Sequence, residues 1–312
     1  MNVQYIEPLS RGYGRMKQAL FQPFNMKKWF VVGFTAWLAG LLDGGGSSGG
    51  NSSSNIDGDF GDVLDAPNKA WMWVQDNPQW TIAIIFGIVF LFFFIAVLTW
   101  LSSRGKFMFV DNVVHDRALI AQPWHEYSKE GDSLFVWRFI YSLVCIAAVV
   151  GFLYQAWQSL YLLYFGSYDG SIPWPFLIKT IFLFVLLMMA LGYIDLLINE
   201  FIVAIMYKHR VTASQAWQRL LAIHWQHFAK FLLFAILWSV MVIAVVILVI
   251  IGGLVTCCIG FILLLLPYIN AVVTLPISYT FRGFSLEFLA QFGDEYSVFS
   301  DQTDSGQSVA VG

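Results

Sequence analysis

The sequence predicts an all-α membrane protein, a polytopic transmembrane helical bundle of about six spans with interfacial amphipathic helices on the cytoplasmic side. Of its 312 residues, 58% are hydrophobic and only 12% are charged, whereas a soluble domain carries about 25% charged residues. The mean hydropathy is +0.68. Long apolar stretches also alternate with segments in which Lys and Arg gather. With so little charge, a soluble fold could not cover its surface.

Composition excludes several other classes of protein. The apolar content is too high for an intrinsically disordered chain, and three cysteines in 312 residues cannot make a disulfide scaffold. A net charge of −3 and a pI near 5.9 exclude a nucleic-acid binder. The lipid bilayer is therefore the expected partner, together with membrane proteins that the sequence does not identify.

Six apolar stretches are candidates for membrane spans within one integral membrane domain over residues 1–290. They run over residues 29–42, 81–101, 135–165, 174–206, 231–251 and 259–281. A helix needs about 20 apolar residues to cross the hydrocarbon layer. The second, fifth and sixth stretches have about that length, and the third and fourth are long enough to tilt or to project beyond the lipid.

The first stretch has only 14 residues, so a re-entrant segment or the core of a signal peptide are alternatives to a crossing. Charge placement favours the crossing. With six crossings and both termini in the cytoplasm, all but Lys69 and Lys179 of the 17 Lys and Arg residues lie on the cytoplasmic side. Such a distribution follows the positive-inside rule.

Two segments are expected to lack packed structure. Residues 43–66 are rich in Gly, Ser and Asp, which predicts a flexible external loop. Its glycines lack the strand, helix and Lys of a phosphate-binding loop, and its aspartates lack the ligand order of a calcium loop. Residues 291–312 are polar and acidic, which predicts a disordered tail.

Three inner segments mix apolar, aromatic and basic residues, namely 16–24, 113–127 and 213–228. We expect helices that lie along the membrane plane. Each precedes a pair of spans, which indicates a threefold repeat of one interfacial helix and two crossings; the alternative is that inner loops of membrane proteins generally look like this. Pro267 and Pro276 should kink the last span.

Asp195, Asn199 and Glu200 are candidate polar-pathway residues in the fourth span, because ionisable groups in lipid usually serve a function. Asp195 and Asn199 share a helix face. The alternative is that all three lie at the inner, projecting end of this long stretch. They would then pair with Lys208, Arg138 or Arg282.

Other chemistry finds little support in the sequence. His224 and His227 are spaced for a shared metal, but zinc needs three or four ligands, so we expect interfacial histidines and no metal or cofactor. Cys257 and Cys258 are adjacent, a spacing at which a disulfide is strained. No catalytic motif is found.

Ala216-Trp217 opens the third unit of inner helix and span pair, and the last span runs from Pro267-Tyr268 to Phe281-Arg282. With these residues and this layout, the sequence resembles an uncharacterised bacterial family of six-span membrane proteins. That family is distantly similar to the membrane domain of glycerophosphoryl diester phosphodiesterases. The catalytic domain of those enzymes has a His-Arg-Gly signature, whereas Val211 follows His209-Arg210 here, so the resemblance implies no activity.

We therefore expect a non-enzymatic multi-pass protein of a bacterial inner membrane, acting as a scaffold, a partner-binding protein or a lipid-organising protein. A small transporter or channel that uses the polar residues of the fourth span is the alternative. The two differ in where Asp195 and Asn199 lie, since a water-filled cavity favours transport and the neighbourhood of Arg or Lys does not.

Overall fold

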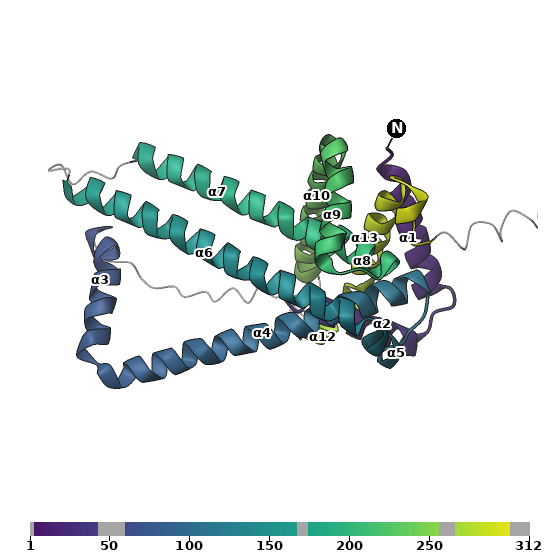
Figure 1. Cartoon of the computed structure of the whole chain (residues 1–312), viewed down its shortest axis with the longest axis horizontal. Helices are drawn as coiled ribbons and strands as arrows, with labels where there is room; N and C mark the ends of the chain where they lie inside the picture. Colours follow the sequence, from purple (N-terminus) through teal and green to yellow (C-terminus); the bar gives the residue numbers. More distant parts are fainter. Residues whose placement is uncertain (1–2, 43–59, 167–173, 256–265, 300–312) are drawn as a thin grey trace, which may run out of the picture. The chain divides into compact units, whose positions relative to one another are not determined.

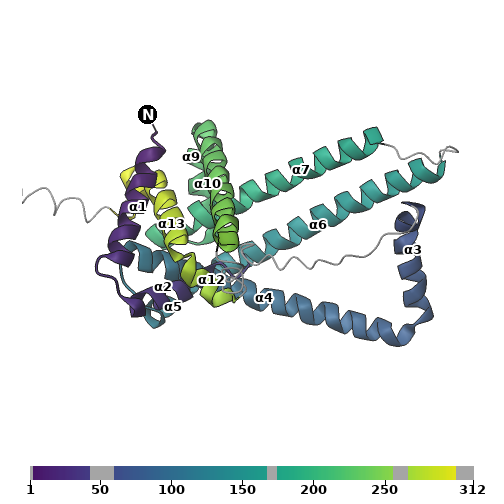
Figure 2. The ribbon, with the colours of Figure 1, turned by 180° about the vertical axis from the view of Figure 1, so that it is seen from behind.

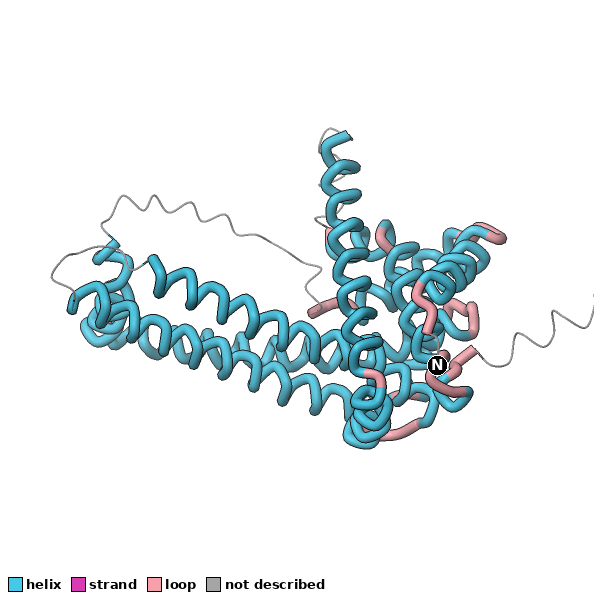
Figure 3. The backbone as a smooth tube through the Cα atoms, turned by 90° about the horizontal axis from the view of Figure 1, so that it is seen from above, coloured by secondary structure: helices cyan, strands magenta, loops and turns pink. Residues whose placement is uncertain are grey.

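The computed structural model describes residues 3–42, 60–166, 174–255 and 266–299. Within these ranges the chain forms helices and no strand (Figure 3). It divides into two compact units. Unit 1 comprises residues 1–46, 99–137 and 193–312, and unit 2 comprises residues 47–98 and 138–192. The all-helical fold class is confirmed.

Four helical segments are long and apolar enough to cross a membrane. They are α4 (Pro78–Val114), α6 (Ser128–Gly166), the continuous run of α7 (Trp174–Leu196), the π-helix η1 (Leu197–Ile202) and α8 (Val203–His209), and α10 (Phe228–Val255). They contain the second, third, fourth and fifth predicted spans. In the most apolar window of α4, no residue is buried inside the protein.

The first and sixth predicted spans are not confirmed. The first falls on α2 (Met26–Ala39), which has 14 residues, fewer than the roughly 20 that a crossing needs. Of the sixth, residues 259–265 lie outside the described residues, and the remainder is divided between α12 (Pro267–Val273) and α13 (Leu275–Ala290). Pro267 is the first residue of α12 and Pro276 is the second residue of α13, and a proline has no N–H to continue a helical ladder. The interruption expected from Pro267 and Pro276 is thus found.

The helix α2 packs against α12 within unit 1. The indole Nε1 of Trp29 donates a hydrogen bond to the carbonyl of Val272 at 2.8 Å, and the Tyr268 hydroxyl donates to the carbonyl of Phe30 at 3.0 Å. A Cβ on Gly33 would lie 2.8 Å from a methyl group of Val272. A small residue at this position therefore allows the two helices to approach closely.

The first helix, α1 (Ile6–Phe21), lies alongside α13 in unit 1 (Figures 1 and 2). The two meet at Gly12 and Gly283. A Cβ on Gly12 would lie 2.8 Å from the backbone nitrogen of Phe284, and one on Gly283 would lie 3.0 Å from the Cα of Gly12. Since both backbones are in contact at this crossing, neither position has room for a side chain.

The centre of unit 1 is a cluster of aromatic rings. Phe201, Phe231, Phe234 and Phe288 are all buried. The ring centroids of Phe234 and Phe288 lie 4.4 Å apart, and those of Phe201 and Phe234 lie 5.0 Å apart. Burial of such large side chains is the main stabilising contribution to a helical core.

The structure corrects both predicted unstructured segments. Residues 43–59 of the predicted loop lie outside the described residues, but residues 60–66 form the start of α3 (Phe60–Asp76). In the predicted tail, residues 291–299 pack onto unit 1, where Tyr296 and Phe299 are buried and the guanidinium of Arg15 lies 3.8 Å from the Phe299 ring. These two aromatic side chains anchor this part of the tail, because they bury a large apolar area and the acidic residues beside them have little apolar area to bury.

Helices are present in the three inner segments that were expected to be amphipathic. They are α1, α5 (Ala121–Glu126) and α9 (Ala213–Gln226). In α1, the buried residues recur on one helical face, at Gly12, Met16 and Leu20, as expected for a helix with one packed side. That face covers α13, and whether the opposite face lies on a membrane stays a prediction.

Candidate functional site

The polar residues of the fourth span lie at its inner end. Asp195 is in the last turn of α7, and Asn199 and Glu200 are in η1. The side-chain amide of Asn199 donates to Asp195 Oδ2 at 2.9 Å. Both Asn199 and Glu200 are buried in unit 1. The structure therefore brings the first two together, as their spacing predicted, and turns Glu200 to a different partner.

That partner is Arg282 of α13. Its Nη1 donates to Glu200 Oε2 at 3.3 Å and to the backbone carbonyl of Asn199 at 2.8 Å. The hydroxyl of Ser285 donates to the same Glu200 oxygen at 2.6 Å. Arg282 is one of the three basic partners expected from the sequence. A carboxylate held this way joins η1 to α13, since a buried charge is tolerated only when it is paired and hydrogen-bonded.

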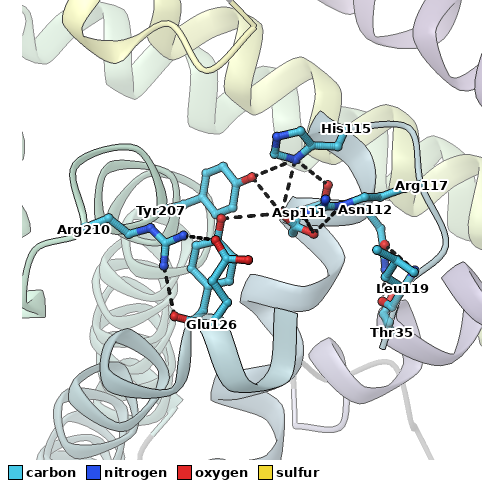
Figure 4. A network of polar contacts seen from close by, with 10 residues as sticks. Thr35, Asp111, Asn112, His115, Arg117, Leu119, Glu126, Tyr207 and Arg210 are labelled. Carbon is cyan, nitrogen blue, oxygen red and sulfur yellow. Dashed lines mark hydrogen bonds and ion pairs between the residues drawn. The ribbon is translucent and has the colours of Figure 1, made fainter. Parts of the chain in front are cut away.

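A second buried polar cluster was not foreseen from the sequence. Asp111, near the C-terminal end of α4, is completely buried, and its carboxylate is contacted by four side chains, the most distant being the Tyr127 hydroxyl, which donates to Oδ1 at 3.5 Å (Figure 4). Arg117 makes a bidentate contact, with Nη2 at 2.8 Å from both carboxylate oxygens. The Tyr207 hydroxyl donates to Oδ1 at 3.0 Å, and Nδ1 of His115 lies 3.2 Å from the same oxygen.

The local backbone brings Arg117 back to Asp111. The helix α4 ends at Val114, and Asp116 adopts a left-handed conformation with φ of +50°. Asn112 then fixes the returning segment, because its amide donates to the carbonyl of Leu119 at 3.0 Å and accepts from the Leu119 N–H at 2.9 Å. Short polar residues of this kind are well suited to turns, where they satisfy backbone groups.

An adjacent ion pair fixes α5 against the end of α8. Arg210 lies over the ring of Tyr127, 3.7 Å from its centroid, and donates to the backbone carbonyl of Glu126 at 3.0 Å. It also pairs with the Glu126 carboxylate (Figure 4). The Tyr127 ring stacks on Tyr207 with centroids 4.9 Å apart, so the cation–π contact connects this pair to the Asp111 cluster.

The electrostatics of the cluster keep its donors protonated. Burial works to lower the pKa of Arg117, but its hydrogen bond to Asp111 and the charge of that carboxylate outweigh burial and raise the pKa above its ordinary value. Burial raises the pKa of Tyr127 to about 12. Arg117 is therefore always a cation and Tyr127 a neutral hydroxyl at physiological pH.

This geometry supports a structural role for the Asp111 cluster. An Asp–His pair can act as a general base when a nucleophile lies against the imidazole. Among the described residues, however, the polar contacts of His115 are with Asp111 and Tyr207. The lone pairs of Asp111 are all directed at donors of its own chain. The cluster can therefore join α4, α8 and the segment between α4 and α5.

The two histidines that could share a metal lie in different surroundings. His224 is buried, with its ring centroid 5.1 Å from that of Phe231 and 5.9 Å from that of Tyr193. His227 lies against Phe292, with centroids 5.4 Å apart. Within the described ranges, no group of three His, Cys, Asp or Glu side chains could hold a metal ion.

Stability should decrease in mild acid because of His224. Burial among aromatic rings lowers its pKa below the ordinary value of 6.5, so the unfolded chain binds a proton more readily than the fold does. The stabilisation is then complete above about pH 6.5 and is lost as the pH falls toward the folded pKa. We expect the thermal midpoint of His224→Leu to fall less between pH 7.5 and pH 5 than that of the wild type. An equal fall in both proteins would contradict this prediction; exposed His125→Leu serves as the control.

Comparison with known proteins identifies the family. A family model matches residues 4–286 of the chain. The chain belongs to the family of unknown function DUF7544. No curated protein and no solved structure matches it. Membership in DUF7544 agrees with the expected uncharacterised family, while the similarity to the membrane domain of the phosphodiesterases stays a prediction.

Proposed function

We propose that this DUF7544 protein is a non-enzymatic multi-pass membrane protein that acts as a scaffold, binding lipids and membrane partners through the outer faces of its helices. The observation that carries the proposal is the exposed apolar surface of the four long helices. In their most apolar windows, between 0% and 17% of the residues are buried within the protein. An apolar surface of this extent needs lipid or another apolar partner to cover it.

The proposed topology has six crossings with both termini in the cytoplasm of a bacterial inner membrane. The four long helices supply four of the crossings. The other two would involve α2 and residues 259–281, of which α12 packs against α2. Basic residues support this orientation, because nearly all of them fall on one side of the membrane in it. Trp80 and Trp174 are more than half exposed and stand at the outer ends of their helices, where tryptophan commonly meets the headgroups.

A scaffold is favoured over an enzyme or transporter because the buried charges serve interhelical contacts. Asp111, Glu200 and Glu287 each pair with an arginine of their own chain. Removing such a charge from its partner would cost several kcal/mol. These groups are therefore suited to fixing helices in one arrangement.

A small transporter is the second candidate, and one observation favours it. The π-helix η1 is a rare element that often occurs at functional sites. It contains Asn199, whose Oδ1 is buried without a hydrogen-bond partner, close to Arg282, whose Nε is also unpartnered. A water or a passing ion could satisfy these atoms.

Flux through reconstituted liposomes separates the two functions. For a scaffold, we expect proton and potassium leak equal to that of protein-free liposomes, with no change in Asp195→Ala, because its contact with Asn199 is structural. Exposed Asp294→Ala is the matched acidic control. A leak that is well above the protein-free level and disappears only in Asp195→Ala, with folding intact, would instead establish transport.

A further inference from the structure

Unit 2 contains a pocket between α6 and α7, which run side by side (Figures 1 and 2). It has a volume of about 230 Å³. The two helices contact each other on its inner side, toward the start of α6 and the end of α7. The rings of Phe152 and Phe184 lie 5.6 Å apart, and the Tyr141 hydroxyl donates to the carbonyl of Leu191. The residues that line the pocket are Phe152, Gln155, Ala156, Ser159, Phe176, Lys179, Thr180 and Leu183.

Lys179 gives this pocket a positive charge. It is the only charged residue in the described ranges 139–166 and 174–192. Among the described residues, no carboxylate lies within ion-pairing distance of its ammonium group. A charge in an apolar hairpin is costly unless something balances it, so the pocket suits an anionic ligand.

Three further lining residues can donate hydrogen bonds to such an anion. Gln155 and Ser159 face the pocket from α6, and Thr180 faces it from α7. Within the described part of the hairpin, these three side chains have no hydrogen bonds to other residues. An ammonium group with hydroxyl and amide donors around it suits the oxygens of a phosphate.

The surroundings of Lys179 are apolar and suit acyl chains. Its neighbours Ile178, Ile181 and Phe182 are each more than 60% exposed. Lys179 follows Trp174 by five residues, about 7.5 Å along a helix. In the proposed topology, Trp174 lies at the outer surface of the membrane, so the ammonium group lies at the depth of the outer phosphate and carbonyl layer.

We infer that the α6–α7 pocket binds the phosphate of an anionic phospholipid from the outer leaflet, with Lys179 as its counter-ion. This inference rests on the proposed membrane scaffold and names the lipid class that it binds. An anionic lipid is favoured over a zwitterionic one because its net negative charge balances the single charge of Lys179, whereas the amine of a zwitterionic headgroup already offsets its phosphate. Its acyl chains lie along the exposed apolar faces beside the pocket.

Lipid retention tests the inference directly. The protein is assembled into nanodiscs of equal parts phosphatidylglycerol and phosphatidylcholine with matched acyl chains, released into mild detergent, and analysed by native mass spectrometry. The wild type should retain more phosphatidylglycerol than phosphatidylcholine. Lys179→Gln should reduce that ratio about fivefold, as expected for one lysine near a membrane surface.

Two variants control for charge and fold. Lys179→Arg keeps the charge and should keep the preference, and Lys69→Gln removes a charge outside the pocket and should leave the ratio unchanged. The inference is overturned, and the proposed function is not, if the wild type shows no lipid preference or if Lys179→Gln keeps the wild-type ratio. A wild type without lipid preference is the result expected if an acidic side chain of a partner helix occupies the pocket. A protein that does not enter nanodiscs overturns the proposed function as well.

Discussion

Asp111→Ala should lower the free energy of unfolding by about 3 kcal/mol or more, the usual cost of removing one member of a buried ion pair. The substitution leaves Arg117, Tyr207 and His115 directed at an empty space where a fully buried carboxylate was. Unfolding in mixed micelles, followed by far-ultraviolet circular dichroism, measures the effect. The loss of structure should be greatest at the end of α4, because the segment that follows it no longer has the contact between Arg117 and Asp111.

Asp132→Ala is the matched control for Asp111→Ala. Asp132 also accepts a bidentate contact from an arginine, with Nη2 of Arg104 at 2.9 Å from both oxygens. Its side chain is half exposed, however, so solvent screens the pair and we expect a loss of less than about 1 kcal/mol. Equal losses in the two variants would show that burial does not set the strength of these ion pairs.

Gly12→Ala should lower the free energy of unfolding by about 2 kcal/mol, as is typical of an inserted group in a tightly packed contact. The new methyl would lie 2.8 Å from the backbone nitrogen of Phe284 and 3.1 Å from the carbonyl oxygen of Thr280. Backbone atoms cannot rotate away, so α1 and α13 must separate. The same micelle titration measures the change.

Gly14→Ala in the same helix gives the control and should have the opposite sign. A Cβ on Gly14 would meet nothing within 4 Å, and alanine is favoured over glycine inside a helix by about 1 kcal/mol. Gly14→Ala should therefore raise the unfolding midpoint slightly. If Gly12→Ala is also stabilising, α1 and α13 do not cross at their glycines.

Much of the fold follows from apolar periodicity and length. The second to fifth spans are single long stretches of hydrophobic residues, and each lies within a continuous helix. The first and sixth were harder to predict, because their fate depends on packing. Gly33 and Tyr268 bring α2 and α12 together through contacts distant in the sequence, and a composition window contains no information about such a pair.

The segment 102–134 is too short to form a core of its own. It instead shares one with α2, since the Ser102 hydroxyl donates to the carbonyl of Ala39 at 2.7 Å and a Cβ on Gly105 would lie 2.7 Å from the backbone nitrogen of Ala39. Each inner segment is too short to bury a core when it is considered separately. The core that these segments share depends on contacts between helices that are distant in the sequence.

The candidate site was predictable in part. The four-residue spacing of Asp195 and Asn199 predicted a shared helix face, and the two side chains are in contact. The inner position of Glu200 predicted Arg282 as one of three possible partners, and the two form an ion pair. Asp111 was missed because its main partner, Arg117, lies across a left-handed turn at Asp116. The one signal available was an Asp-Asn pair inside an otherwise apolar helical segment, at residues 111 and 112.

Cysteine labelling tests the central claim, which is that the apolar faces of the long helices are covered by lipid. Phe182→Cys on α7 and Val89→Cys on α4 replace side chains that are 67% and 60% exposed, in a protein whose native cysteines are replaced by alanine; Lys129→Cys is the aqueous control. In nanodiscs, a membrane-impermeant maleimide should label residue 129 rapidly and leave residues 182 and 89 unmodified until the lipid is dissolved. Rapid labelling of all three positions in intact nanodiscs would contradict the account.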